Sequence, residues 1–278
     1  MKIAISAEST IDLTQELLDK YQIHTIPFGI TFKGELREDY IGISKDIFEF
    51  VDETKILPKT SAISPENYRL YFEGLKEKYD AVIHISISSQ MSSTYNNARL
   101  ASQELENVYV IDSKNLSTGI ALVAIRGCEM VKAKKKPQDI YDELVALTDK
   151  VRVSFVLDKL NYMYKGGRCS AVTLLGANIL KIKPQIVVTD GRMGVGKKYR
   201  GNLNKVIANY CDDVLADNPN ADKSLVFITH SSSMPEEESL IEARLKEAGF
   251  ETIYNTFANG TVCSHCGPNC IGILFVEK

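Results

Sequence analysis

The sequence lacks the segments that direct a protein into or across a membrane. No basic stretch followed by a long apolar run opens the 278-residue chain, so we expect no signal peptide. No window approaches the roughly 18 apolar residues that span a bilayer. We therefore expect a cytoplasmic protein without a membrane anchor.

An excess of basic residues is also missing. The chain has 33 Lys and Arg against 36 Asp and Glu, which gives a formal net charge of -3. A general nucleic-acid-binding protein needs a dense basic surface to neutralise phosphates. The charge balance therefore argues against nucleic acid as a partner.

Standard catalytic motifs are missing as well. The chain has neither the Gly-x-Ser-x-Gly pattern nor a P-loop. The glycines of residues 191–196 lie in a predicted hairpin and do not form a dinucleotide-binding fingerprint. Serines, a histidine and aspartates are present, but their spacing does not indicate a hydrolase triad.

The cysteines give little support for a metal or a disulfide framework. Cys263, Cys266 and Cys270 are clustered, but no second Cys-x-x-Cys pair accompanies them. His265 directly precedes Cys266, which makes it hard for both to bind one tetrahedral ion. We expect reduced thiols and no metal or other cofactor, while a metal or redox site at these cysteines remains an alternative.

The first half of the chain alternates strands with helices. Strands are expected at residues 2–6, 80–86 and 107–112, an extended run at 24–32, and helices at 13–21, 45–52, 64–79, 94–105 and 117–150 with a break at Pro137. Thr10 or Asp12 is expected to cap the first helix, and Ser64-Pro65 is a strong helix start. Strands separated by helices predict right-handed crossovers and a mostly parallel sheet.

The second half has a mixed pattern. Strands are expected at residues 151–157, 184–189, 193–199, 225–229, 251–257 and 271–276, with helices at 203–215 and 235–248. Asp190-Gly191 is the turn of a hairpin. We therefore predict an α/β protein of two lobes, a Rossmann-like parallel-sheet lobe over residues 1–150 and a mixed-sheet lobe over residues 151–278, with a ligand between them.

Several polar loops lie where such a fold binds ligands. Open parallel sheets bind ligands at the carboxyl ends of their strands, and the loop of residues 88–95 follows such a strand and opens a helix. A helix N-terminus with serine and threonine hydroxyls suits a carboxylate or phosphate, although one serine can simply be an N-cap. The loop of residues 60–65 is similar. Ser64 is expected to cap the next helix, which leaves the hydroxyls of Thr60 and Ser61 free for other contacts.

Two further features remain ambiguous in the sequence. In residues 165–168, two glycines present Arg168, whose guanidinium matches a carboxylate, although a plain turn is the simpler interpretation. Lys197, Lys198 and Arg200 form a basic strip on the predicted hairpin. This strip is either a solvated strand edge or a docking site for a protein partner.

In their order and spacing, these motifs resemble those of the DegV family along almost the whole chain. The matching segments are residues 8–12 (Glu-Ser-Thr-Ile-Asp), 60–65 (Thr-Ser-Ala-Ile-Ser-Pro), 88–95, 112–113, 166–168, 182–184, 190–191 and 265–268 (His-Cys-Gly-Pro). Each motif is short, and the ordered set is specific. The chain departs from the family pattern at Ser93, where glycine is usual, and at Asn269-Cys270, where Gly-Ala is usual.

The resemblance implies that a long-chain fatty acid is bound in a buried tunnel between two lobes, with its carboxylate at the seam. The residues implied at the carboxylate are Thr60, Ser61, Ser92, Ser93, Arg168 and His265. The family also implies a separate fatty acid kinase that phosphorylates the presented carboxylate, so that acyl phosphate enters phospholipid synthesis. Transient contact with a membrane fits such a carrier, and a hydrolase or phosphotransferase using Ser92 and His265 is the alternative.

Overall fold

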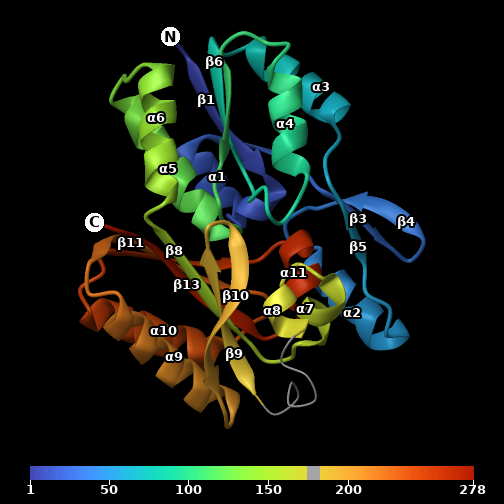
Figure 1. Ribbon diagram of the computed structural model, residues 1–278, viewed down its shortest axis with the longest axis vertical. Coiled ribbons are helices and arrows are strands. Elements are labelled where there is room, and N and C mark those ends of the chain that lie inside the picture. The colour runs from blue at the N-terminus through green and yellow to red at the C-terminus, as the bar shows by residue number, and fades with distance from the viewer. Residues whose placement is uncertain (174–181) are drawn as a thin grey trace.

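The computed structural model describes residues 1–173 and 182–278 as three sheets with helices packed around them (Figure 1). The first is a four-stranded parallel sheet in the order β2-β1-β6-β7. Its strands are β1 (Ile3–Glu8), β2 (Ile23–Ile26), β6 (Ala81–Ser86) and β7 (Val108–Asp112). Every residue of β6 is buried, as expected for a parallel strand covered on both faces. The predicted parallel sheet is confirmed.

Five helices accompany this sheet. They are α1 (Gln15–Tyr21), α3 (Pro65–Lys76), α4 (Thr94–Ser102), α5 (Thr118–Lys132) and α6 (Pro137–Thr148). Ser64 caps α3 by accepting a hydrogen bond from the Asn67 N–H, as predicted. The prediction for α1 was wrong, because Thr14 accepts the capping bond from Leu17 N–H while Asp12 is committed elsewhere.

The second sheet was not predicted. It is antiparallel, in the order β4-β3-β5, and consists of β3 (Gly29–Phe32), β4 (Glu35–Glu38) and β5 (Lys59–Ser61). Helix α2 (Ser44–Thr54) connects β4 to β5 along the chain. The expected single run over residues 24–32 is divided at Pro27, and its two parts join different sheets. This division matters for function, because β5 carries Thr60.

The third sheet is mixed, in the order β10-β9-β8-β13-β11-β12. Its strands are β8 (Val151–Leu157), β9 (Lys183–Thr189), β10 (Arg192–Tyr199), β11 (Ala221–His230), β12 (Thr252–Phe257) and β13 (Cys270–Glu277). Only β11 and β12 pair in parallel among the strands of this sheet. Asp190 and Gly191 both have positive φ at the β9–β10 turn, which confirms the predicted hairpin.

The remaining helices belong to the second half of the chain. They are α7 (Asn161–Gly166), α8 (Ser170–Thr173), α9 (Leu203–Asp217), α10 (Pro235–Glu247) and α11 (Gly260–Cys266). The sequence predicted α9 and α10, but no helix was expected over residues 260–266. Across the two described ranges, no helix is long and apolar enough to cross a bilayer.

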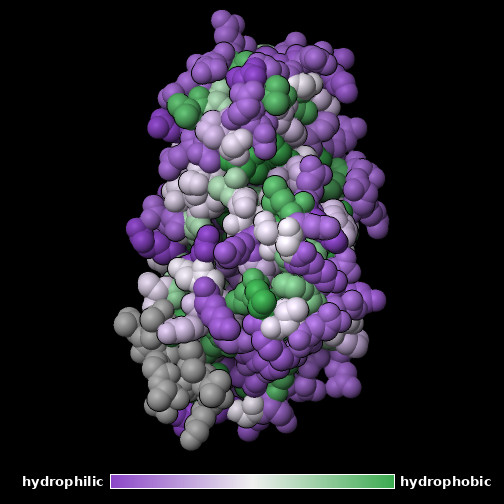
Figure 2. Space-filling model, turned by 90° about the vertical axis from the view of Figure 1, so that its right-hand side faces the viewer, coloured by the Kyte–Doolittle hydropathy of each residue, from purple (hydrophilic) through white to green (hydrophobic). Residues whose placement is uncertain are grey.

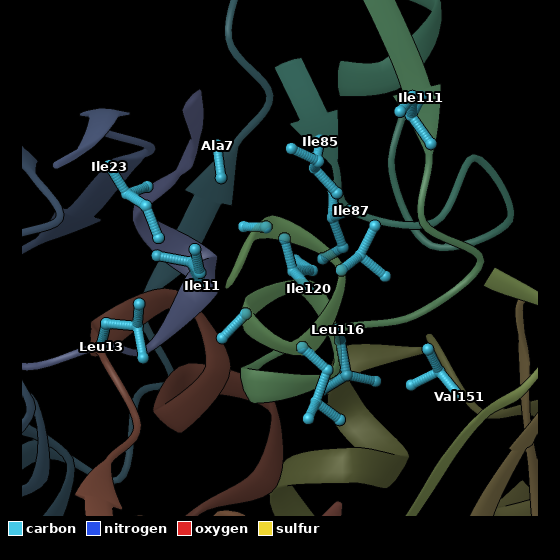
Figure 3. Close-up of a cluster of buried hydrophobic side chains, with 14 of the residues drawn as sticks. Ala7, Ile11, Leu13, Ile23, Ile85, Ile87, Ile111, Leu116, Ile120 and Val151 are labelled. Atoms are coloured by element: carbon cyan, nitrogen blue, oxygen red, sulfur yellow. The ribbon is translucent and has the colours of Figure 1, made fainter. Parts of the chain in front are cut away.

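Helix α5 joins the two large sheets. It packs against β1 and β6 on one side and against β8 and β13 on the other. Figure 3 shows Ile87, Leu116 and Ile120 close together around the start of this helix. The largest hydrophobic cluster therefore takes side chains from both halves of the chain. The lobe boundary near residue 150 consequently remains a prediction, although all strands of the third sheet follow it.

Candidate functional site

A cavity of about 260 Å³ lies where the three sheets meet. Much of its wall is apolar, from residues of β8, β10, β13 and the loops that follow β6 and β7. These residues are Ile87, Leu116, Val153, Phe155, Met193 and Leu274. Two of them, Ile87 and Leu116, belong to the cluster in Figure 3, so the cavity is an extension of the core between the sheets.

Hydroxyl, imidazole and guanidinium groups line the same cavity. The structure brings together five of the six residues expected at the carboxylate, namely Thr60, Ser92, Ser93, Arg168 and His265. The sixth, Ser61, is exposed and is absent from the described lining. Ser61 follows Thr60 in a strand, where successive side chains point to opposite faces.

Thr60 and His265 form a hydrogen-bonded pair. The Thr60 Oγ1 and His265 Nε2 atoms are 3.0 Å apart, although 205 positions separate the residues. Burial lowers the pKa of His265 to about 4, and the nearby Arg168 adds to this effect, so the ring is neutral at pH 7. In the tautomer that carries its proton on Nε2, His265 donates to Thr60. The Thr60 hydroxyl is then left to donate to a ligand.

The second ring nitrogen of His265 lies against Gly166. His265 Nδ1 is buried and makes no hydrogen bond to any residue that the structure describes. A Cβ atom at position 166 would lie 2.6 Å from Nδ1, so only glycine allows this approach. Glycine at position 166 therefore allows the imidazole ring to pack against the backbone. The sequence alone did not distinguish this role from a plain turn.

The second glycine of the pair places Arg168. Gly167 ends α7 with φ +69°, a left-handed conformation that favours glycine. Arg168 then lies at the cavity, and its Nη1 donates to the Gly166 carbonyl at 2.7 Å. The side chain is exposed, so it adds positive charge at the cavity without being enclosed in it.

Ser92 and Ser93 lie at the start of α4. Ser92 Oγ is 2.7 Å from Thr94 Oγ1 and accepts the Thr94 N–H. Ser93 has φ -72°, an ordinary value for any residue. The serine that replaces the usual glycine therefore introduces no backbone strain at this position.

Two buried aspartates, Asp12 and Asp39, hold the helix that carries His265, a role that no sequence motif indicated. Asp39 accepts the Gly260 N–H at 2.8 Å, the Thr261 N–H at 3.1 Å and the Ser9 hydroxyl at 2.9 Å. Asp12 accepts the Asn259 N–H at 2.8 Å. The N–H groups at the start of α11 thus donate to carboxylates from the first 40 residues of the chain. Negative charge at this end stabilises the helix dipole.

Burial raises the pKa of both carboxyl groups, and the hydrogen bonds that they accept oppose this rise. A buried carboxylate persists only when such donors surround it. Asp12 and Asp39 therefore act as positioning residues for α11 and, through it, for His265.

The hydrogen bonds do not support the catalytic alternative. A serine nucleophile must lie within hydrogen-bond reach of its histidine base. His265 instead pairs with Thr60, and Ser92 pairs with Thr94. Ser92 and His265 face one cavity but have separate partners.

Cys263, Cys266 and Cys270 are buried free thiols next to the cavity. Cys266 and Cys270 line it directly. Among the His, Cys, Asp and Glu side chains of the described ranges, no group of three could hold a metal ion. The three residues are therefore a set of buried thiols, two of which line the cavity.

Comparison with known proteins identifies the family. A family model described as "Uncharacterised protein, DegV family" matches residues 2–278. A DegV domain-containing protein of Clostridium acetobutylicum is 30% identical over 282 residues, covering 100% of this chain and 99% of the relative. The match therefore extends over both halves of the chain.

Solved structures share the fold. A DegV family protein from Thermus thermophilus superposes with a TM-score of 0.92 at 24% identity, covering 100% of both chains. DegV of Bacillus subtilis, described as a fatty acid binding protein, has a TM-score of 0.87 at 27% identity over 100% of both chains. A stearic-acid-binding protein from Eubacterium ventriosum has a TM-score of 0.83 at 25% identity, covering 99% of this chain and 98% of its own. The chain belongs to the DegV family.

Proposed function

We propose that the protein is a cytoplasmic carrier that binds one long-chain fatty acid and is not itself an enzyme. The carboxylate lies at Thr60 and Ser92, and the acyl chain fills the apolar part of the cavity. One observation carries the proposal: a cavity with hydrophobic walls gathers Thr60, Ser92, Arg168 and His265 at one site. Two solved structures of the same fold, both described as fatty-acid-binding proteins, support it.

The energetics of a fatty acid suit this division of the cavity. Each buried methylene group contributes about 0.8 kcal/mol to the binding free energy. A tail of about fifteen methylene groups therefore contributes roughly 12 kcal/mol before association costs. An unpaired buried carboxylate would cost several kcal/mol. The head therefore needs donors, and hydroxyl groups beside a neutral His265 supply them without a fixed positive charge in the enclosed part of the site.

We further propose that the bound carboxylate is presented to a separate fatty acid kinase, which forms acyl phosphate for phospholipid synthesis. Hydroxyl groups hold a carboxylate less tightly than a bidentate arginine, which suits transfer to a second protein. The basic strip is the proposed docking site. All three residues of the strip are exposed, and Lys197 is paired with Asp213 and Asp217 at 2.8 and 2.7 Å.

Charge reversal of Lys198 and Arg200 tests the docking role of the strip. Lys198→Glu with Arg200→Glu is expected to reduce kinase-dependent acyl phosphate formation at least roughly tenfold, because complementary charge accelerates association. Fatty acid affinity is expected to stay unchanged. Lys205→Glu with Lys223→Glu provides a control of equal charge change. Loss of lipid binding in the strip variant would refute a role limited to docking.

Extraction of the gently purified protein tests the carrier role. Mass spectrometry of the extract is expected to find about one fatty acid per chain, because enclosure of the tail makes release slow. Ester and phosphate substrates are expected to remain unconsumed. An extract without fatty acid, together with turnover of such substrates, would instead support the enzyme that uses Ser92 and His265.

A further inference from the structure

Three thiols form a compact cluster beside the cavity. Cys263 and Cys266 are three residues apart in α11, so they lie on the same face of the helix. Cys270 begins β13 immediately after the turn that follows this helix. The three side chains have 0, 4 and 7% of their surface exposed, and all are free thiols. Two of the three, Cys266 and Cys270, face the cavity.

Cys266 is the central member of the cluster. The adjacent Cys263 and Cys270 thiols lower the pKa of Cys266 well below its ordinary value, although burial opposes the effect. The same contacts and burial raise the pKa of the two neighbours. A thiolate is the reactive form of cysteine, so Cys266 is the most nucleophilic of the three. Cys263 lies on the same helix face as Cys266, and Cys270 lines the same cavity, so either residue can supply the second thiol.

The position of the cluster restricts which oxidant can reach it. Since the thiols are buried and Cys266 lines the cavity, a reagent reaches Cys266 through the cavity. An acyl chain that fills this cavity excludes small reagents from solution. The natural reactant is therefore a group carried on the acyl chain itself, held next to the sulfur at high effective concentration.

We infer that Cys266 reduces a fatty acid hydroperoxide bound in the cavity, with Cys263 or Cys270 closing a disulfide. This inference rests on the proposed fatty acid binding and adds a reaction to it. The reactant is an acyl chain that bears an –OOH group, the product of lipid oxidation. The product is the corresponding hydroxy fatty acid.

The reaction balances in two steps. The Cys266 sulfur attacks the terminal oxygen of the hydroperoxide, an S–O bond forms, and the O–O bond breaks. The alkoxide that leaves takes the proton lost by the Cys266 thiol and becomes the alcohol. The neighbouring thiol then attacks the sulfenic sulfur, a disulfide forms, and hydroxide leaves with the thiol proton as water. Two thiols are oxidised for each hydroperoxide reduced.

The test uses the whole protein, freed of lipid and fully reduced, with 5-hydroperoxyeicosatetraenoic acid as the probe, because Cys266 directly follows His265 at the proposed carboxylate site and the reacting group must lie near that end of the chain. One equivalent is expected to yield one hydroxy acid and to remove two free thiols, which dithiothreitol restores. tert-Butyl hydroperoxide, which has no carboxylate or acyl chain, is expected to react at least roughly tenfold more slowly. Equal rates for the two peroxides would overturn the inference.

Serine variants locate the reaction. Cys266→Ser is expected to abolish hydroxy acid formation, whereas the matched control Cys211→Ser, buried in the separate cluster beneath α9, is expected to react as wild type. Peptide mass mapping of the oxidised wild type gives a second readout that needs no variant. A disulfide joining Cys266 to Cys263 or Cys270 supports the inference, and oxidation confined to Cys128 or Cys211 overturns it.

Stearic acid binding separates this inference from the proposed function. A protein that binds stearic acid but leaves the hydroperoxide unreduced refutes the reaction alone. A protein that binds neither acid refutes the carrier role as well.

Discussion

Replacing Asp39 by alanine is expected to lower the free energy of unfolding by about 3–5 kcal/mol, the usual cost of leaving buried donors of a polar network without their acceptor. Asp39 has 3% of its surface exposed. Its carboxylate accepts the Gly260 N–H, the Thr261 N–H and the Ser9 hydroxyl. Alanine removes all three acceptor contacts and leaves these donors at a buried position.

The same substitution is expected to weaken lipid binding, because α11 carries His265 on its last turn. A shift of α11 separates His265 from Thr60 and so disturbs the hydroxyl that is proposed to bind the carboxylate. Asp39→Asn keeps one acceptor oxygen and is expected to cost less than alanine in both measurements. Partial rescue by asparagine would show that the acceptor, more than the side-chain volume, is what α11 requires.

Urea unfolding followed by circular dichroism measures the stability change. Asp52→Ala, at an exposed position of α2, is the matched control and is expected to change stability by no more than about 0.5 kcal/mol. If Asp39→Ala proved as stable as this control, the two aspartates would not anchor the helix.

Combining Thr60→Ala with Ser92→Ala is expected to raise the Kd for a long-chain fatty acid roughly a hundredfold. Each hydrogen bond to a charged group contributes about 1.5–3 kcal/mol, and 1.4 kcal/mol corresponds to a tenfold change in affinity. Both hydroxyls line the cavity, and the acyl chain contacts remain. The loss therefore reports on the carboxylate alone.

Displacement of a fluorescent fatty acid measures this change, with thermal unfolding as the check on folding. The double control Thr25→Ala with Ser239→Ala removes two exposed hydroxyls that are not part of the described cavity lining, and it is expected to bind normally. The corresponding fatty alcohol provides a ligand control. Because the alcohol has no charge to satisfy, its affinity is expected to fall less. Unchanged affinity of the double variant for the acid would show that the head lies elsewhere.

The parallel sheet was predictable because each of its strands is specified by the residue types within that strand. The runs of residues 3–8 and 81–86 are short, apolar and rich in β-branched residues, which is typical of strands buried on both faces. Ser64 followed by Pro65 and the Asp190-Gly191 turn also specify their structures through their own backbone preferences. Glycine at 167 belongs with these, since its φ of +69° is a property of one residue.

Helix α11 was not predictable in the same way. It has seven residues, begins with glycine and is too short to form by propensity alone. Its N-terminal N–H groups find their acceptor on Asp39, 221 positions away in the chain. A segment that the sequence presents as a Cys- and Gly-containing loop becomes a helix because distant carboxylates complete it.

The sequence by itself determined the parallel sheet with its main helices, the β9–β10 hairpin, the family, and most of the residue types that a carboxylate site needs. The tertiary structure decided that Thr60 pairs with His265, that Ser61 points away, and that three thiols border the cavity. The reason is physical. Backbone preferences act over a few neighbouring residues, whereas a cavity arises only where segments from the two halves of the chain enclose space between them.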